Sequence, residues 1–207
     1  SPARRISKTN LEHQSHGAER TMKPQLGDTI LNRYTLVSSL REEPGIQAWK
    51  ANDRVLAKDC QVFIITDRSA FAAIDKLAGR IAATRPDRVI PVLKYRMESD
   101  VLLIVMPVDS GQCLTDYMVD TAKPLSYSAI RSIIGECANV LREIIADTPS
   151  SIVITTDTVR VTTSGVQIAD APCATMLADT SATDLRTDGP ERYAIRQLAA
   201  LLYTLLT

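Results

Sequence analysis

The sequence predicts an α+β protein in which a five-stranded antiparallel sheet with one helix is followed by a mainly helical part. Short apolar runs separated by turn residues dominate positions 26–108, and one helical repeat interrupts them. From position 109 onward, apolar residues recur mainly at three- and four-residue steps. We therefore expect a flexible linker or tail at 1–25, a first part at about 26–108 and a second part at about 109–207.

The elements of the first part follow from these patterns in order. Ser69 is the expected N-cap of a helix that ends at about Thr84, because Arg85 and Pro86 follow it. The polar residues 41–45 and 97–100 are expected to form turns between strands. The predicted strands are 34–37, 46–51, 60–65, 89–96 and 101–107.

The second part contains the clearest helix of the chain. Over 126–147 the apolar residues lie on one helical face, and Pro190 is expected at the start of a last helix with a second apolar stripe. Residues 171–189, rich in Thr, Asp, Ala and Ser, are expected to form a loop. The remaining predicted elements are a short helix at 114–119 and small strands at 152–154, 159–161 and 166–168.

Composition excludes several classes of function. The 24 Lys and Arg balance 24 Asp and Glu, so neither a nucleic-acid platform nor a polybasic membrane binder is expected. The four cysteines form no CxxC pair, which favours buried free thiols in a reducing compartment. Both histidines, His13 and His16, lie near the start, so the rest of the chain lacks imidazole for a hydrolytic triad or a metal site. No run approaches the ~18 apolar residues of a membrane span.

Four short stretches resemble the protein kinase family in place and order. LNRYTL at 31–36 and GIQAWKAND at 45–53 are similar to the first two strands of bacterial Ser/Thr kinases. LLIVM at 102–106 resembles the strand that enters the hinge, and LAALLYTLLT at 198–207 resembles a hydrophobic helix of the large lobe. The resemblance covers about 27–207 and implies a two-lobed kinase-like fold with a five-stranded small lobe, one helix there, and a minimal helical large lobe.

The residues that phosphoryl transfer requires are replaced at the matching positions. Phe63 stands where the family has the strand lysine, and Gln61 where a small residue packs on adenine. Glu42 and Glu43 lie in the loop that is otherwise rich in glycine and covers the phosphates, where their charge would oppose a nucleotide. The resemblance thus implies a pseudokinase that binds no cofactor.

The catalytic loop is replaced as well. Val153 falls near the position of the catalytic aspartate and Thr158 near that of the metal-binding asparagine. Asp170 alone matches a metal-binding carboxylate, and we expect it to serve as a turn or cap residue. No catalytic residue and no metal ligand are therefore predicted, and we expect no enzyme activity.

One subgroup fits better than kinases at large. The loop, the second strand and the short Thr-rich segment resemble the cytoplasmic pseudokinase domain of actinobacterial MviN proteins, which are lipid II flippases. That resemblance implies a domain of a membrane protein on the cytoplasmic face, phosphorylated on Thr by a Ser/Thr kinase. The phosphothreonine would recruit a forkhead-associated domain protein that controls peptidoglycan precursor export and cell-wall synthesis. The candidate acceptors are Thr175, Thr180, Thr183, Thr187, Thr84, Thr9 and Thr21.

Two alternatives stay open. One is a nucleotide-binding regulatory domain or weak Ser/Thr kinase that uses Asp170. An open cleft with a basic side chain from elsewhere reaching in beside Asp170 would overturn the inactive domain. The other is an unrelated α+β adaptor whose likeness to kinases arose by chance.

Overall fold

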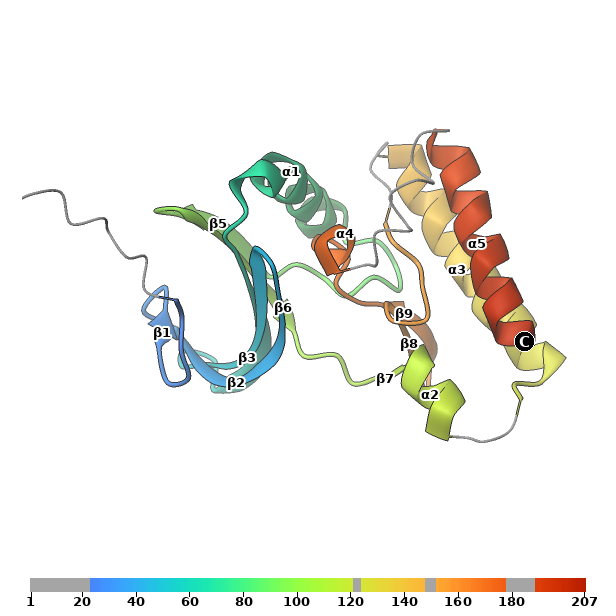
Figure 1. The fold of residues 1–207 in the computed structure, drawn as a ribbon, viewed down its shortest axis with the longest axis horizontal. Helices are drawn as coiled ribbons and strands as arrows, with labels where there is room; N and C mark the ends of the chain where they lie inside the picture. Colours follow the sequence, from blue (N-terminus) through green and yellow to red (C-terminus); the bar gives the residue numbers. More distant parts are fainter. Residues whose placement is uncertain (1–22, 121–123, 148–151, 178–188) are drawn as a thin grey trace, which may run out of the picture.

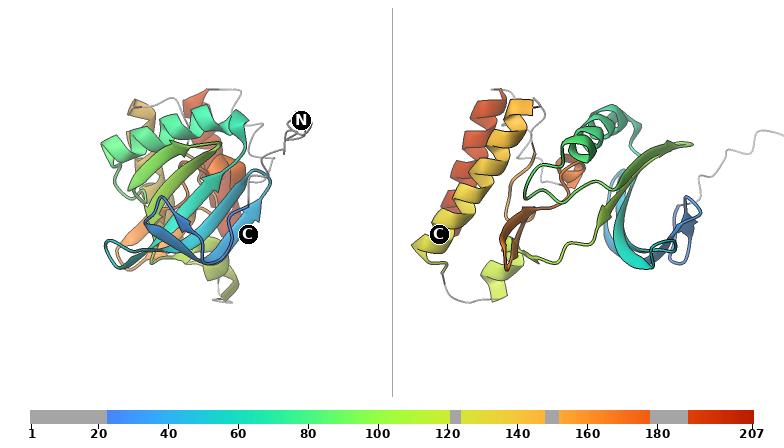
Figure 2. Two further views of the ribbon diagram at one scale, coloured as in Figure 1. Left: turned by 90° about the vertical axis from the view of Figure 1, so that its left-hand side faces the viewer. Right: turned by 180° about the vertical axis from the view of Figure 1, so that it is seen from behind.

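The computed structural model describes residues 23–120, 124–147, 152–177 and 189–207. A curled antiparallel sheet covered by one helix forms one side of the molecule, and two long helices form the other side (Figures 1 and 2). A small sheet lies between them. The predicted α+β class is confirmed. We call the described residues up to 107 the sheet half and those from 108 onward the helical half.

The large sheet has six strands in the order β1-β2-β3-β4-β6-β5, so the predicted count of five is wrong. The additional strand, β1, has two residues, too few for an alternating pattern, and pairs with the start of β2. The other predicted strands of this half are present, although β2 is longer than expected. The strands are β1 (Thr29–Ile30), β2 (Tyr34–Glu43), β3 (Ile46–Asp53), β4 (Lys58–Ile65), β5 (Lys94–Glu98) and β6 (Val101–Pro107).

Apolar side chains cover both faces of this sheet. On the outer face Trp49, Ile64 and Leu103 belong to one buried cluster. On the inner face Phe63 and Ile104 belong to a second cluster, which continues into the helical half. Neighbouring strand residues point to opposite faces, so Phe63 and Ile64 belong to different clusters although they are adjacent in sequence.

Helix α1 (Arg68–Thr84) packs beside the sheet with the expected apolar face inward. Its N-cap is Asp67, whose side chain accepts a hydrogen bond from the backbone N–H of Ser69, so the predicted cap Ser69 lies two residues late. Arg85 ends the helix in the left-handed region with φ 44°. The strand predicted over 89–96 is β5, which begins only at Lys94, because Ile90 bonds instead to Ile168 in the helical half.

The helical half is built on two packed helices and a three-stranded sheet in the order β7-β8-β9. Residues 152–154, a predicted strand, are not one: Gln197 bonds both to the Ile152 carbonyl and to the Ile154 N–H. A short helix, α4, lies within the predicted loop 171–189. The elements are β7 (Gln112–Cys113), α2 (Leu114–Asp120), α3 (Tyr127–Asp147), β8 (Val159–Thr162), β9 (Gly165–Ile168), α4 (Ala174–Leu177) and α5 (Pro190–Leu206).

All four cysteines are free, as the absence of a CxxC pair predicts. Cys60, Cys137 and Cys173 are buried. Burial raises the pKa of Cys60 to about 11 and that of Cys137 to about 12, so both thiols stay protonated at neutral pH. None of the helices in the described part of the chain is long and apolar enough to span a membrane.

Candidate functional site

A cleft of about 1120 Å³ lies between the inner face of the sheet and the helical half. Three of the residues singled out in the sequence meet there: Gln61 and Phe63 from β4, and Asp170 from the turn after β9. Gln61 is half-buried, whereas the Phe63 side chain is 0% exposed and packs in the core below the cleft floor. The side of β4 that faces the cleft therefore offers one amide and no charge.

Asp170 occupies an unusual backbone conformation. Its φ is 60°, in the left-handed region that non-glycine residues rarely adopt, and its carbonyl accepts a hydrogen bond from Cys173 at 2.8 Å. This turn leads directly into α4, as expected of a turn residue. Burial raises the pKa of the Asp170 carboxyl above its ordinary value, and the charge of Arg160 works in the opposite direction.

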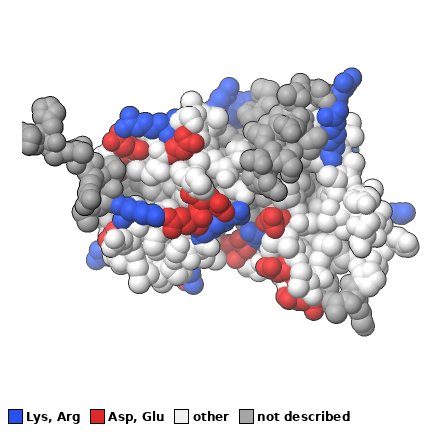
Figure 3. All heavy atoms as spheres, in the orientation of Figure 1, with Lys and Arg blue, Asp and Glu red and all other residues white. Residues whose placement is uncertain are grey.

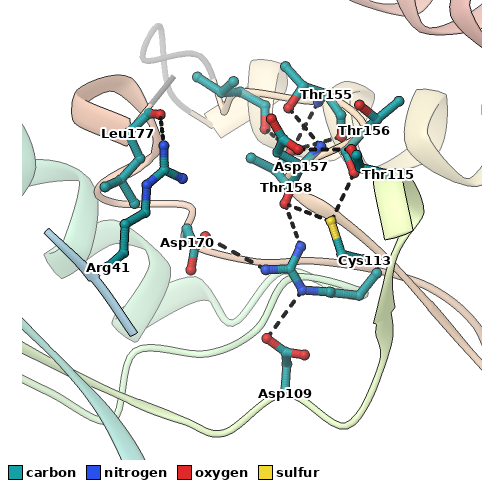
Figure 4. A network of polar contacts seen from close by, with 12 residues as sticks. Arg41, Asp109, Cys113, Thr115, Thr155, Thr156, Asp157, Thr158, Asp170 and Leu177 are labelled. Atoms are coloured by element: carbon teal, nitrogen blue, oxygen red, sulfur yellow. Dashed lines mark hydrogen bonds and ion pairs between the residues drawn. The ribbon is translucent and has the colours of Figure 1, made fainter. Parts of the chain in front are cut away.

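Arg160 of β8 lines the cleft, and Figure 4 shows the three residues that it contacts, Asp109, Asp157 and Asp170. Its Nε donates to Oδ2 of Asp109 at 3.3 Å, and its Nη1 donates to the carbonyl of Asp157. Its Nη2 lies 3.8 Å from Oδ2 of Asp170. The side chains of Arg160 and Asp170 are each 14% exposed, so this ion pair is largely shielded from water. Arg160 thereby joins three separate segments of the chain.

Two further basic side chains line the cleft. Arg41 of β2 donates to the carbonyl of Leu177 at the end of α4, at 2.7 Å, and so bridges the two halves. Lys50 pairs with Asp59 at 3.5 Å. The lining carries two more acidic than basic residues. Figure 3 shows that acidic and basic side chains lie close together on this side of the molecule. Its acidic members are Asp109, Asp116, Asp120, Asp157 and Asp170.

Glu42 and Glu43 do not line this cleft. They border a second groove of about 860 Å³ that reaches the outer sheet face at Ile64 and Leu103. Glu42 forms an ion pair with Lys23, which lowers the pKa of its carboxyl, and Glu43 pairs with Arg41 at 3.2 Å. These two acids therefore belong to a different surface from Gln61, Phe63 and Asp170.

Val153 and Thr158 are buried, and neither lines the cleft. The Thr158 hydroxyl donates to the Val153 carbonyl and accepts from the N–H of Thr155, both at 2.9 Å. The side chain that this loop presents to the cleft is Asp157, which accepts a hydrogen bond from Thr115 at 2.8 Å.

The residues at the centre of the site that sequence reasoning missed are Asp109, Asp157 and Arg160. The alternation of Val159, Arg160 and Val161 predicts only that Arg160 points away from its neighbours. It does not say that the opposite side faces a cleft, because Asp109 lies 51 positions away.

Two of the candidate phospho-acceptors lie in the described residues. Thr84 is exposed at the end of α1, where its hydroxyl donates to the Arg80 carbonyl at 2.8 Å. Thr175 is half-buried in α4. The other candidates lie outside the described residues, namely Thr9, Thr21, Thr180, Thr183 and Thr187.

No cluster of three His, Cys, Asp or Glu side chains suited to a metal ion occurs within the described ranges. No family model matches the chain, and no curated protein matches it. The functional argument therefore starts from the arrangement of elements and from the chemistry of the cleft.

Proposed function

We propose that this chain is a catalytically inactive protein kinase-like domain, a pseudokinase, that acts as a phospho-regulated scaffold. The order of the long elements supports this: β2, β3 and β4 precede α1, and β5 and β6 follow it before the helical half begins. This is the β-β-β-α-β-β succession that the kinase resemblance implies. A cleft at the boundary with the helical half also fits the proposal.

The observation that carries the proposal is the chemistry of this cleft. Phe63, at the position of the family's lysine, is fully buried and has neither charge nor donor. The acidic residues of the lining outnumber the basic ones, which opposes a triphosphate. The residue at the centre, Arg160, is already paired with Asp109 and Asp170. A nucleotide would have to displace these carboxylates.

The presence of Arg160 beside Asp170 favours the rival function, a nucleotide-binding regulatory domain or weak kinase that uses Asp170. The cleft is open, and Arg41 and Lys50 also line it. We retain the inactive domain as the leading proposal because Arg160 is not a free cation in the cleft: its Nε, Nη1 and Nη2 atoms contact acidic or carbonyl oxygens of the chain itself.

The scaffold function and its partners rest on the resemblance to the MviN pseudokinase domain. In this proposal the parent protein is embedded in the membrane, and the domain lies at its cytoplasmic face. A Ser/Thr kinase phosphorylates one Thr, which then recruits a forkhead-associated domain protein to control peptidoglycan precursor export. Thr84 fits such a reader because it is exposed and Asp87 follows three residues later.

A thermal-shift titration with ATP and Mg²⁺ tests the inactive cleft. We expect no change in Tm, because only a ligand that binds the folded state raises it. ADP with Mg²⁺ and Mg²⁺ alone serve as controls. A saturable rise in Tm with ATP that is absent with Mg²⁺ alone would replace the leading proposal by its rival.

Treatment with a receptor-type Ser/Thr kinase, followed by phosphosite mapping and capture by a forkhead-associated domain, tests the scaffold. We expect phosphate on Thr and capture only after treatment. Thr84→Ala removes the hydroxyl that would accept the phosphate. This hydroxyl bonds to the carbonyl of Arg80 in the same helix, so the substitution should remove the acceptor and leave the fold intact. If no Thr is modified, this chain does not contain the acceptor.

A further inference from the structure

We propose that Arg160 is an internal cation that holds two cleft carboxylates together and makes the cleft independent of any bound metal ion. The proposal extends the proposed function and rests on it in one respect: the cleft of the unmodified protein does not bind a Mg²⁺-nucleotide. Arg160 is a positioning residue here, since it acts through Asp109 and Asp170.

The first argument is the set of atoms around the guanidinium. It contacts a carboxylate oxygen of Asp109, a carboxylate oxygen of Asp170 and the backbone carbonyl of Asp157. All of these contacts are oxygens, the ligand type that hard divalent cations such as Mg²⁺ prefer. The guanidinium of Arg160 thus lies at a place where several oxygen atoms that could bind a cation come together.

The second argument is burial. The side chains of Asp109 and Asp170 are 17% and 14% exposed, so water screens their mutual repulsion poorly. Like charges in such surroundings require a cation or the protonation of one group. Burial raises the pKa of Asp170 most, and the charge of Asp109 raises it further, whereas the charges of Arg160 and Arg41 lower it.

The third argument is connectivity. Asp109 follows β6, Asp157 precedes β8 and Asp170 follows β9, so the three contacts of Arg160 join three separate segments around the cleft. Arg41 adds a further bridge from β2 to the carbonyl of Leu177. The cleft is held by fixed charges of the chain, which need no ligand to assemble.

The variant Arg160→Met tests this inference, because methionine keeps an apolar stem and removes the cation. The two carboxylates then lose the cation that contacts both of them, and we expect Mg²⁺ alone to stabilise the variant but not the unmodified protein. At a Mg²⁺ concentration about tenfold above its Kd, the folded-to-unfolded ratio rises about 11-fold, which corresponds to roughly 3–5 °C in Tm. Arg160→Lys retains a charge and should show no such response.

A matched control is Arg33→Met. Arg33 also pairs with an aspartate, Asp53, through two hydrogen bonds of 2.8 Å, and no second carboxylate of the described residues forms an ion pair with it. This variant should be destabilised without gaining a response to Mg²⁺. If Arg160→Met responds no more than Arg33→Met, or if the unmodified protein responds equally, the inference is wrong.

If Arg160→Met does not fold, the double variant Arg160→Met/Asp170→Asn decides the question. It removes one of the two repelling carboxylates, so folding should recover without a response to Mg²⁺. A double variant as unstable as the single one would show that Arg160 acts by packing and would overturn the inference. The ATP titration of the unmodified protein is a separate measurement, so failure of the proposed function is distinguishable from failure here.

Discussion

The sheet half and the helical half of this molecule satisfy their buried backbone groups in different ways. In the sheet half, long antiparallel strands bond backbone to backbone, and two apolar clusters cover the two faces. In the helical half, the irregular residues 152–158 combine backbone–backbone bonds with bonds from side chains: Gln197 and Thr158, both buried, bond to their backbone. Irregular buried segments need such partners because unpaired backbone groups are costly.

This difference indicates where each half is vulnerable. Apolar burial is spread over many residues of the sheet, so one truncation removes a share of it. In the helical half, a single side chain satisfies two backbone groups. Three substitutions sharpen the comparison.

The largest expected effect is in the sheet core. Phe63→Ala removes a fully buried ring and leaves a cavity, which costs about 3–5 kcal/mol of the free energy of unfolding. Urea denaturation followed by circular dichroism measures it. Val37→Ala, on a side chain that is 46% exposed in β2, is the control and should change stability by less than about 0.5 kcal/mol. A small effect for Phe63→Ala would mean that this core tolerates a cavity.

Gln197→Ala is the corresponding test of the helical half. It leaves the Ile152 carbonyl and the Ile154 N–H without their partner, at a cost of about 2–4 kcal/mol. The same denaturation measurement applies. Gln112→Ala removes an exposed amide that bonds to Asp120 at 2.9 Å and should cost far less. Equal effects of the two substitutions would mean that the bonds of Gln197 to residues 152 and 154 do not stabilise the helical half.

The smallest expected effect is electrostatic and depends on pH. The hydrogen bonds from Arg33 lower the pKa of Asp53 to about 2. A carboxylate with a lowered pKa in the folded state stabilises it above the unfolded pKa of about 4, and this contribution is lost as the pH falls toward 2. Stability measured between pH 5 and pH 2 should therefore fall less steeply in Asp53→Asn than in the unmodified protein. If the two proteins lose stability in parallel between pH 5 and pH 2, the pair of Arg33 and Asp53 does not contribute to the loss of stability in acid.

Segments with a regular spacing of apolar residues were predictable because this spacing is visible in the local sequence. The pattern located β3, β4, α1, α3 and α5 to within a few residues, because each has an apolar face long enough to show its period. The two-residue strands β1 and β7 have no period to detect. Residues 152–154 have the composition of a strand, but they face Gln197 instead of a neighbouring strand.

The candidate site divides along the same line. The kinase resemblance grouped Gln61, Phe63 and Asp170, and all three line one cleft. They lie on or directly after regular strands, so their positions follow from the sheets. It placed Glu42 and Glu43 beside them, but they border another groove. The end of a hairpin has no fixed relation to the core, so its side chains follow the curl of the sheet, which residue spacing does not reveal.

Residue order and apolar period were enough to establish the α+β class and most of the elements. The central position of Arg160 emerged only once the chain had folded. Its partners Asp109, Asp157 and Asp170 come from three loops, and loops meet according to how the sheets and helices pack around them. Period is a local property of the chain, whereas the meeting of charges across a cleft depends on the whole fold.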